Sequence, residues 1–279
     1  MQNAFEFFFE MEQILGILNP SEKIAAVFNL RKAFENCIEF QYNHSSPPKI
    51  ISTPSYATSC TIVHGAHVER RRRLDTIEGR GVFLHAIAHI EYSAVDLALD
   101  TCYRFRHLPS QYYEDWLAVA FDEAQHFVML RELLTACDVQ YGTYAVHTGI
   151  FDAMKRSQNS LRQRMAATHR YLEAGGLDAH PDLEQKFARF DDPLSLKIRA
   201  ALRKIYEEEI DHVRKGDFWF RYACGQDQES LDIFRSDVES AIPGVKFGNK
   251  KFNVEARRRA GFIEAEIESL FQAKPRFSA

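Results

Sequence analysis

Four long segments between residues 79 and 223 carry apolar residues at helical spacing and few residues that break a helix. The 279 residues include 13 glycines and 9 prolines, a low number that disfavours turn-rich all-β folds. Pro109-Ser110 and Asp192-Pro193 are typical of helix starts, and Gly175-Gly176 is typical of a helix end. We therefore expect an all-α protein in which the four segments form a four-helix bundle. The expected helix bounds are 79–105, 110–137, 148–173 and 193–223.

The bundle is expected to occupy residues 76–224, between two extensions. Residues 1–75 are predicted to form an N-terminal helical extension and loop, because apolar residues up to residue 44 recur at helical steps and residues 45–60 are loop-like. Residues 225–279 are predicted to form a polar C-terminal extension that packs on the bundle. Further expected features are a helix start at Asn19-Pro20, a short helix from Pro181, a turn at Ala241–Gly244 and a last helix at 254–272.

The charge balance and the cysteine spacing disfavour several classes of protein. The 35 Lys and Arg residues nearly balance the 39 Asp and Glu residues, so the formal charge of −4 gives no whole-molecule attraction to nucleic acid or anionic membrane. The five cysteines include no Cys-x-x-Cys pair, which disfavours zinc-ribbon and thioredoxin-type sites and suits a reducing compartment. No signal-peptide pattern is present, and no apolar stretch approaches the roughly 18 residues that span a bilayer. We expect a soluble cytoplasmic protein.

Two Glu-x-x-His motifs are the strongest chemical signal in the sequence. Glu123 and His126 lie in the second predicted bundle helix, and Glu209 and His212 lie in the fourth, 86 positions later (209 − 123). Three residues make about one helical turn, so the Glu and His of each motif project from one face. One such motif arises easily by chance in a helix-rich chain, but two on alternate bundle helices predict a pair of metal-binding turns.

A two-metal site of this kind needs one further carboxylate from each of the other two helices. Glu91 is the candidate in the first helix, because a carboxylate within its apolar stripe needs a partner to offset desolvation. Glu173 is the candidate in the third helix, at that helix's expected end, and Asp152 is the alternative. Such a ligand field suits two iron ions, or manganese. The predicted ligands are Glu91, Glu123, His126, Glu173, Glu209 and His212.

The first bundle helix carries a second polar stripe, which we call the histidine stripe. It consists of His85, His89 and Asp96 on one face, whereas Glu91 points to nearly the opposite face. Either Glu91 is the ligand and the histidine stripe contacts another element, or the reverse holds. His169, one turn before the predicted ligand of the third helix, is a candidate supporting residue or substitute ligand.

Several motifs between residues 65 and 265 together resemble a known family. They are Glu78–Arg80, Leu84–Glu91, Asp122–His126, Glu173–Asp178, Glu209–His212, Phe252–Arg257 and Ala260–Phe262. With them the chain resembles the ferritin-like superfamily, whose four-helix bundles carry Glu, Glu-x-x-His, Glu and Glu-x-x-His. It looks most similar to an uncharacterised bacterial family of ferritin-like proteins, and this resemblance implies Glu173 as a ligand. It is more distantly similar to the di-iron tRNA hydroxylases of the MiaE type.

Three functional hypotheses follow from these motifs. The first is a di-iron oxidoreductase that activates O₂ and acts on an unknown small-molecule substrate. The second is a non-catalytic metal-binding protein. The third is an RNA-modifying enzyme in which Arg70–Arg73 and Arg257–Arg259 contact phosphates, although a basic run is more often a solvated face. The histidine stripe could also form the interface of a homo-oligomer.

Overall fold

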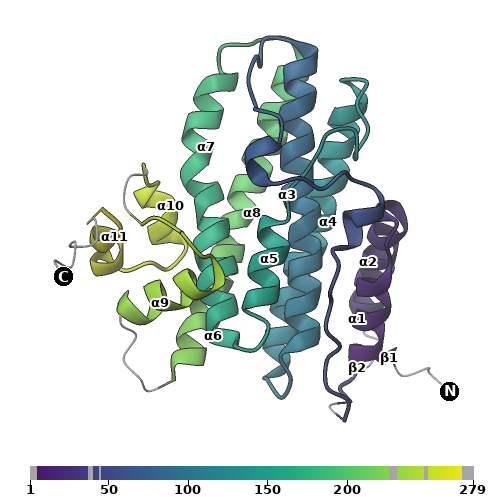
Figure 1. Ribbon diagram of the computed structural model, residues 1–279, viewed down its shortest axis with the longest axis vertical. Coiled ribbons are helices and arrows are strands. Elements are labelled where there is room, and N and C mark those ends of the chain that lie inside the picture. The colour runs from purple at the N-terminus through teal and green to yellow at the C-terminus, as the bar shows by residue number, and fades with distance from the viewer. Residues whose placement is uncertain (1–4, 37–39, 44, 226–230, 248–250, 272–279) are drawn as a thin grey trace. The chain divides into compact units, whose positions relative to one another are not determined.

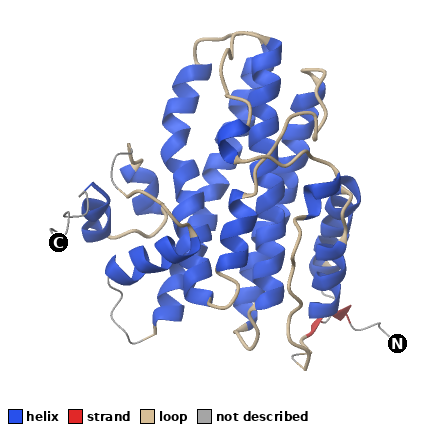
Figure 2. Ribbon diagram, viewed as in Figure 1, coloured by secondary structure: helices blue, strands red, loops and turns tan. Residues whose placement is uncertain are grey.

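The computed structural model describes residues 5–36, 40–43, 45–225, 231–247 and 251–271. Helices dominate these residues, as Figure 2 shows, so the predicted all-α class is confirmed. The described strands are β1 (Phe5–Glu6) and β2 (Phe40–Gln41), which pair in parallel. The chain divides into two compact units. Unit 1 is Met1–Phe151 with Asp192–Ala201, and unit 2 is Asp152–Asp191 with Leu202–Ala279. The division into a bundle with two extensions stays a prediction.

Two long helices form the centre of unit 1. α3 (Ile77–Arg104) and α4 (Ser110–Thr135) lie side by side (Figure 1) and match the predicted bounds within two residues. The Thr76 hydroxyl accepts a hydrogen bond from the Gly79 N–H at 3.1 Å and so caps the start of α3. Most of α3 is buried, as expected for the central helix of a core.

The N-terminal helices of unit 1 pack on this pair. α1 (Phe7–Gly16) contacts α3, and α2 (Pro20–Glu35) contacts α4. The predicted helix start at Asn19-Pro20 is confirmed, because the Asn19 side chain accepts hydrogen bonds from the backbone N–H groups of Ser21 and Glu22. The start of α2 is therefore fixed by its own cap.

Two loops of unit 1 are joined to each other. The segment with the short turns η1 (Ser55–Thr58) and η2 (Gly65–His67) meets the loop after α4 through a bridge between Ile62 and Val146. Gly142 has a φ of +99°, and a Cβ there would lie 2.2 Å from the Ser59 carbonyl oxygen. Only glycine suits both the backbone conformation and this close approach.

The third predicted bundle helix is wrong in its bounds. The chain forms α5 (Gly149–Arg156), turns, and then continues as α6 (Leu161–Arg164), the π-helical segment η3 (Met165–Leu172) and α7 (Glu173–Phe187). The break comes early because the Ser160 hydroxyl caps α6 by accepting from the Gln163 N–H. Gly175-Gly176 does not end the helix, since neither glycine adopts positive φ.

Pro181 lies inside α7 and does not start a helix, contrary to the prediction. A proline in a helix interior has no N–H to donate to the carbonyl four residues earlier, here that of Leu177. The Asn253 side-chain amide donates to this carbonyl at 3.3 Å instead. The lost helical hydrogen bond is thus replaced from a distant part of the same unit.

The remaining helices differ from the prediction mainly after residue 225. α8 (Pro193–Cys224) matches its predicted bounds within one residue. The predicted polar C-terminal extension contains α9 (Leu231–Ala241), which packs on α6 and η3. The prediction of one last helix at 254–272 is wrong. The chain instead forms α10 (Val254–Arg259) and α11 (Glu264–Phe271), which are separated at Gly261, whose φ is +99°. Residue 272 lies outside the described residues.

One helix is apolar and long enough to cross a membrane by length and composition alone. This is α3, and 78% of its most apolar window is buried inside the protein, which is typical of a core helix. No membrane-spanning segment is therefore indicated among the described residues. Four of the five cysteines are described, and each is a buried free thiol; Cys37 lies outside the described residues.

Candidate metal centre

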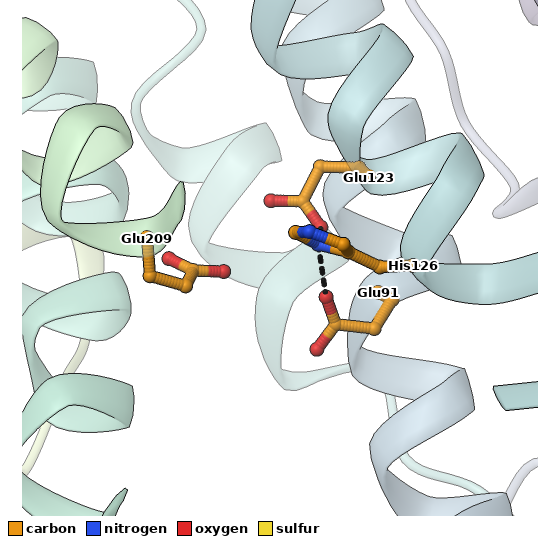
Figure 3. A group of neighbouring side chains, drawn as sticks. All are labelled: Glu91, Glu123, His126 and Glu209. Atoms are coloured by element: carbon orange, nitrogen blue, oxygen red, sulfur yellow. Dashed lines mark hydrogen bonds and ion pairs between the residues drawn. The ribbon is translucent and has the colours of Figure 1, made fainter. Parts of the chain in front are cut away.

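Three predicted ligands of unit 1 form a buried cluster between α3 and α4. Glu91 is 4% exposed, and Glu123 and His126 are fully buried. His126 Nδ1 lies 3.0 Å from Glu91 Oε2 and 3.5 Å from Glu123 Oε2 (Figure 3). One candidate ligand atom from each residue lies within 4.8 Å of the others, so this Glu/His cluster could hold a metal ion. Figure 3 also draws Glu209, which belongs to unit 2.

Aromatic rings from α3, α4 and the loop after α4 pack against one another. Tyr92 follows Glu91 on α3, and Phe127 follows His126 on α4; their ring centroids are 5.0 Å apart. The Tyr141 ring contacts both rings, at 5.5 Å from Tyr92 and 5.0 Å from Phe127. Burial raises the pKa of the Tyr92 hydroxyl. The three rings pack together on the side of α3 that carries His89, whose ring stacks on that of Tyr141.

Other buried carboxylates of α3 lie against cations. Asp96 forms an ion pair with Lys23 at 2.5 Å, and Asp100 forms one with Arg104 at 2.5 Å. Glu91 and Glu123 both lie near the imidazole of His126, which is a metal ligand when neutral. Two carboxylates and one imidazole are also a donor set that divalent iron or manganese accepts.

The histidine stripe contacts other elements of unit 1. His85 Nε2 accepts a hydrogen bond from the Gly142 N–H at 2.9 Å. His89 Nε2 lies 3.0 Å from the His147 carbonyl oxygen and must donate to it, so His89 Nδ1 accepts from the Tyr141 hydroxyl at 3.0 Å. Burial lowers the pKa of His85 and of His89 to about 4. Both rings are therefore neutral near pH 7 and hold the loop after α4 in place.

Unit 2 contains the other three predicted ligands as two local pairs. On α8, His212 is fully buried, and its Nδ1 lies 3.9 Å from Glu209 Oε2. Glu173 begins α7, and its Oε1 lies 2.8 Å from Nδ1 of the buried His169. His169 thus contacts Glu173, and its predicted role as a supporting residue or substitute ligand stays a prediction. Asp152, the alternative to Glu173, lies half-buried on α5.

Glycine permits α8 to pack closely on the π-helical segment. A Cβ at Gly216 would lie 2.7 Å from His169 Cβ and 3.0 Å from its carbonyl carbon. Gly216 is one turn after His212, so the two pairs of unit 2 lie on helices that touch. Short π-helical segments within α-helices are frequent at functional sites.

Comparison with known proteins places the chain in a family. The model of a family described as "Protein of unknown function (DUF455)" matches residues 17–268. The chain belongs to this family. An uncharacterised protein of Haemophilus influenzae is 30% identical over 281 residues, which cover 96% of this chain and 95% of that protein. No solved structure matches the chain. The predicted membership of an uncharacterised family is confirmed, and for this DUF455 protein the buried cluster is the main guide to function.

The two basic runs of this DUF455 protein differ in their surroundings. All four arginines of Arg70–Arg73 are exposed. In the second run, Arg257 pairs with Asp178, Arg258 with Glu264 and Arg259 with Glu207. These carboxylates offset the positive charge of the second run, so Arg70–Arg73 is the stronger candidate for phosphate contacts. An RNA partner stays a prediction, as do a homo-oligomer and a cytoplasmic location.

Proposed function

We propose that this DUF455 protein is a di-metal carboxylate protein with a ferritin-like four-helix bundle, and that it is an oxygen-activating oxidoreductase. The observation that carries this proposal is the buried cluster of Glu91, Glu123 and His126. Carboxylates are rarely buried unless a cation or hydrogen bonds offset their desolvation. A cluster of two within 4.8 Å of one imidazole therefore favours a bound cation.

The proposed ligand set has two halves. Glu91, Glu123 and His126 supply the half from unit 1. Glu173, Glu209 and His212 supply the half from unit 2, so that each bundle helix gives one metal-binding turn. Four carboxylates and two imidazoles favour iron, with manganese as the alternative.

The residues around the site would control its chemistry in defined ways. Carboxylates can bind through one oxygen or two, which accommodates a change in metal oxidation state. His169 would orient Glu173 through their hydrogen bond. Iron, when bound, would supply the electrons that the reduction of O₂ requires.

The test is metal content. Protein purified without chelator and loaded with ferrous iron without oxygen should hold about two metal ions per chain, whereas less than one would refute the site. Glu123→Gln should reduce the metal content to one ion or less while the far-ultraviolet circular dichroism stays unchanged. Glu114→Gln, a half-buried glutamate elsewhere on α4, is the matched control and should bind metal normally.

Oxygen consumption then separates an oxidoreductase from a passive binder. The loaded ferrous protein should consume O₂ and develop the absorption spectrum of oxidised iron held by carboxylates. Full loading without O₂ consumption would contradict the oxidoreductase and leave a metal-binding protein, the second hypothesis of the sequence.

A further inference from the structure

A cleft of about 360 Å³ opens on unit 1 where the start of α2, the end of α4 and the loop after α4 meet. This volume is within the range of small-molecule sites. Its lining includes Arg131 and Phe127 of α4, Tyr141 and Gln140 of the loop, and Ser21 of α2. All of them lie within one compact unit.

Arg131 is the chemically distinctive residue of the cleft. It is half-buried, its Nη1 donates to the Ser21 hydroxyl at 3.0 Å, and its guanidinium lies 5.6 Å from the centre of the Phe127 ring. Within the described part of the chain it forms no ion pair. Arg31, on α2, also stacks on a phenylalanine but pairs with Glu35 at 2.7 Å.

A guanidinium has five N–H donors in a planar fork that matches a carboxylate or phosphate. In Arg131 the Ser21 hydroxyl accepts from one nitrogen, so the fork retains donors for a ligand. Glu132 lies on the same cleft but is exposed, and its carboxylate does not pair with Arg131 among the described contacts. The guanidinium is thus placed to bind an oxyanion.

An organic oxyanion also has an apolar part, and the cleft offers an aromatic surface for it. Tyr141 is half-buried and supplies this surface, and the fully buried Phe127 lies behind it edge to face, at 84° and 5.0 Å between centroids. Tyr141 is held by its hydrogen bond to His89, and Gly142 fixes the loop against Ser59. Rings that are fixed before binding lose little entropy when a ligand packs on them.

We propose that this cleft is a binding site for a small organic oxyanion, a carboxylate or phosphate monoester on a flat apolar body. The oxyanion binds the Arg131 fork, and the flat body packs on the Tyr141 ring. The Gln140 side chain, which lines the same cleft, supplies hydrogen bonds for further polar groups of the ligand.

The cleft stands independently of the metal proposal. Binding to the arginine and the rings requires no metal, and the site can therefore be tested with metal-free protein. Loss of the metal site would leave this proposal intact, and the reverse also holds.

The experiment titrates metal-free full-length protein with benzoate and with phenyl phosphate, using ligand-observed NMR and isothermal titration calorimetry. We expect saturable 1:1 binding of at least one probe, and the stronger probe identifies the oxyanion. Benzyl alcohol and inorganic phosphate should each bind at least tenfold more weakly, because each lacks one half of the ligand. Arg131→Gln should weaken binding at least tenfold, whereas Arg31→Gln should leave it unchanged.

Arg131→Lys tests the fork itself, because it keeps the charge and loses the planar donors. Its affinity should fall between those of the unmodified protein and Arg131→Gln. The proposal is overturned if neither probe binds, if Arg131→Gln binds as tightly as the unmodified protein, or if inorganic phosphate binds as tightly as phenyl phosphate.

Discussion

The buried ion pair between Lys23 and Asp96 should strongly stabilise the packing of α2 on α3. Lys23 is fully buried and Asp96 is 7% exposed, and Nζ lies 2.5 Å from Oδ1. The Ser55 hydroxyl donates to Asp96 Oδ2 at 2.5 Å, and Lys23 Nζ also donates to the Leu15 carbonyl at 3.2 Å. Both charges are therefore desolvated and both depend on the same small network.

Removing one partner of a buried pair leaves the other charge uncompensated, which costs about 3–5 kcal/mol. Lys23→Met keeps the length of the side chain and should lower the free energy of unfolding by that amount. Asp96→Asn keeps the shape and the contact with Ser55 and should do the same. In the double variant neither charge remains, so the loss should be smaller than the sum of the two single losses by at least about 2 kcal/mol.

Urea denaturation of the four proteins, followed by circular dichroism, measures this coupling. Arg31→Gln is the matched control, since Arg31 also lies on α2 but its pair with Glu35 is solvent-exposed, and it should cost less than about 1 kcal/mol. The reasoning is refuted if both single variants lose less than about 1 kcal/mol, or if the double variant loses the full sum, because the pair would then contribute no interaction energy.

Three further outcomes follow from single contacts. Gly142→Ala should cost at least about 1–2 kcal/mol in thermal unfolding, because alanine disfavours positive φ and its Cβ would meet Ser59; an unchanged melting temperature would contradict this. His85 should make unfolding pH-dependent: burial lowers its pKa from 6.5 to about 4, so its contribution is fully present above pH 6.5 and is lost as pH falls towards 4. The free energy of unfolding should be larger at pH 7 than at pH 5 by about 2 kcal/mol or less, and His85→Gln should reduce that difference. Asn253→Leu should cost about 1–3 kcal/mol in urea, since it leaves the Leu177 carbonyl without its donor and removes the cap of α10; a loss below about 0.5 kcal/mol would count against that role.

The spacing of apolar residues predicted the bounds of those helices whose ends are marked by local residues such as proline. α3 and α4 are separated by a short loop ahead of Pro109, and Pro193 begins α8, so local sequence sets three of the four helices predicted for the bundle. The same local reasoning failed at Pro181, because its compensation comes from Asn253, 72 positions later (253 − 181). A contact of that separation leaves no trace in the spacing of apolar residues.

The Glu-x-x-His spacing predicted that Glu123 and His126 lie together in unit 1, whereas nothing in the sequence pointed to the cleft at the start of α2. Glu91, Glu123 and His126 each lie on a regular helix, where one-turn spacing decides which way a side chain points. The cleft instead combines a helix start, a helix end and a loop. Arg131 carries no motif, and its lack of an ion pair becomes visible only when the surrounding side chains are placed.

Glu173 shows how a wrong helix boundary changes the surroundings expected for a predicted ligand. The sequence placed it at the end of a helix, an uncomfortable position for a residue expected in the middle of a bundle. It lies instead inside a continuous helical run from Leu161 to Phe187, directly after the π-helical segment. In a π-helix each N–H bonds five residues back, so the faces presented on either side of it are rotated relative to a uniform 3.6-residue pattern. Spacing on one side of η3 therefore cannot predict direction on the other, and the position of Glu173 follows from its contact with His169.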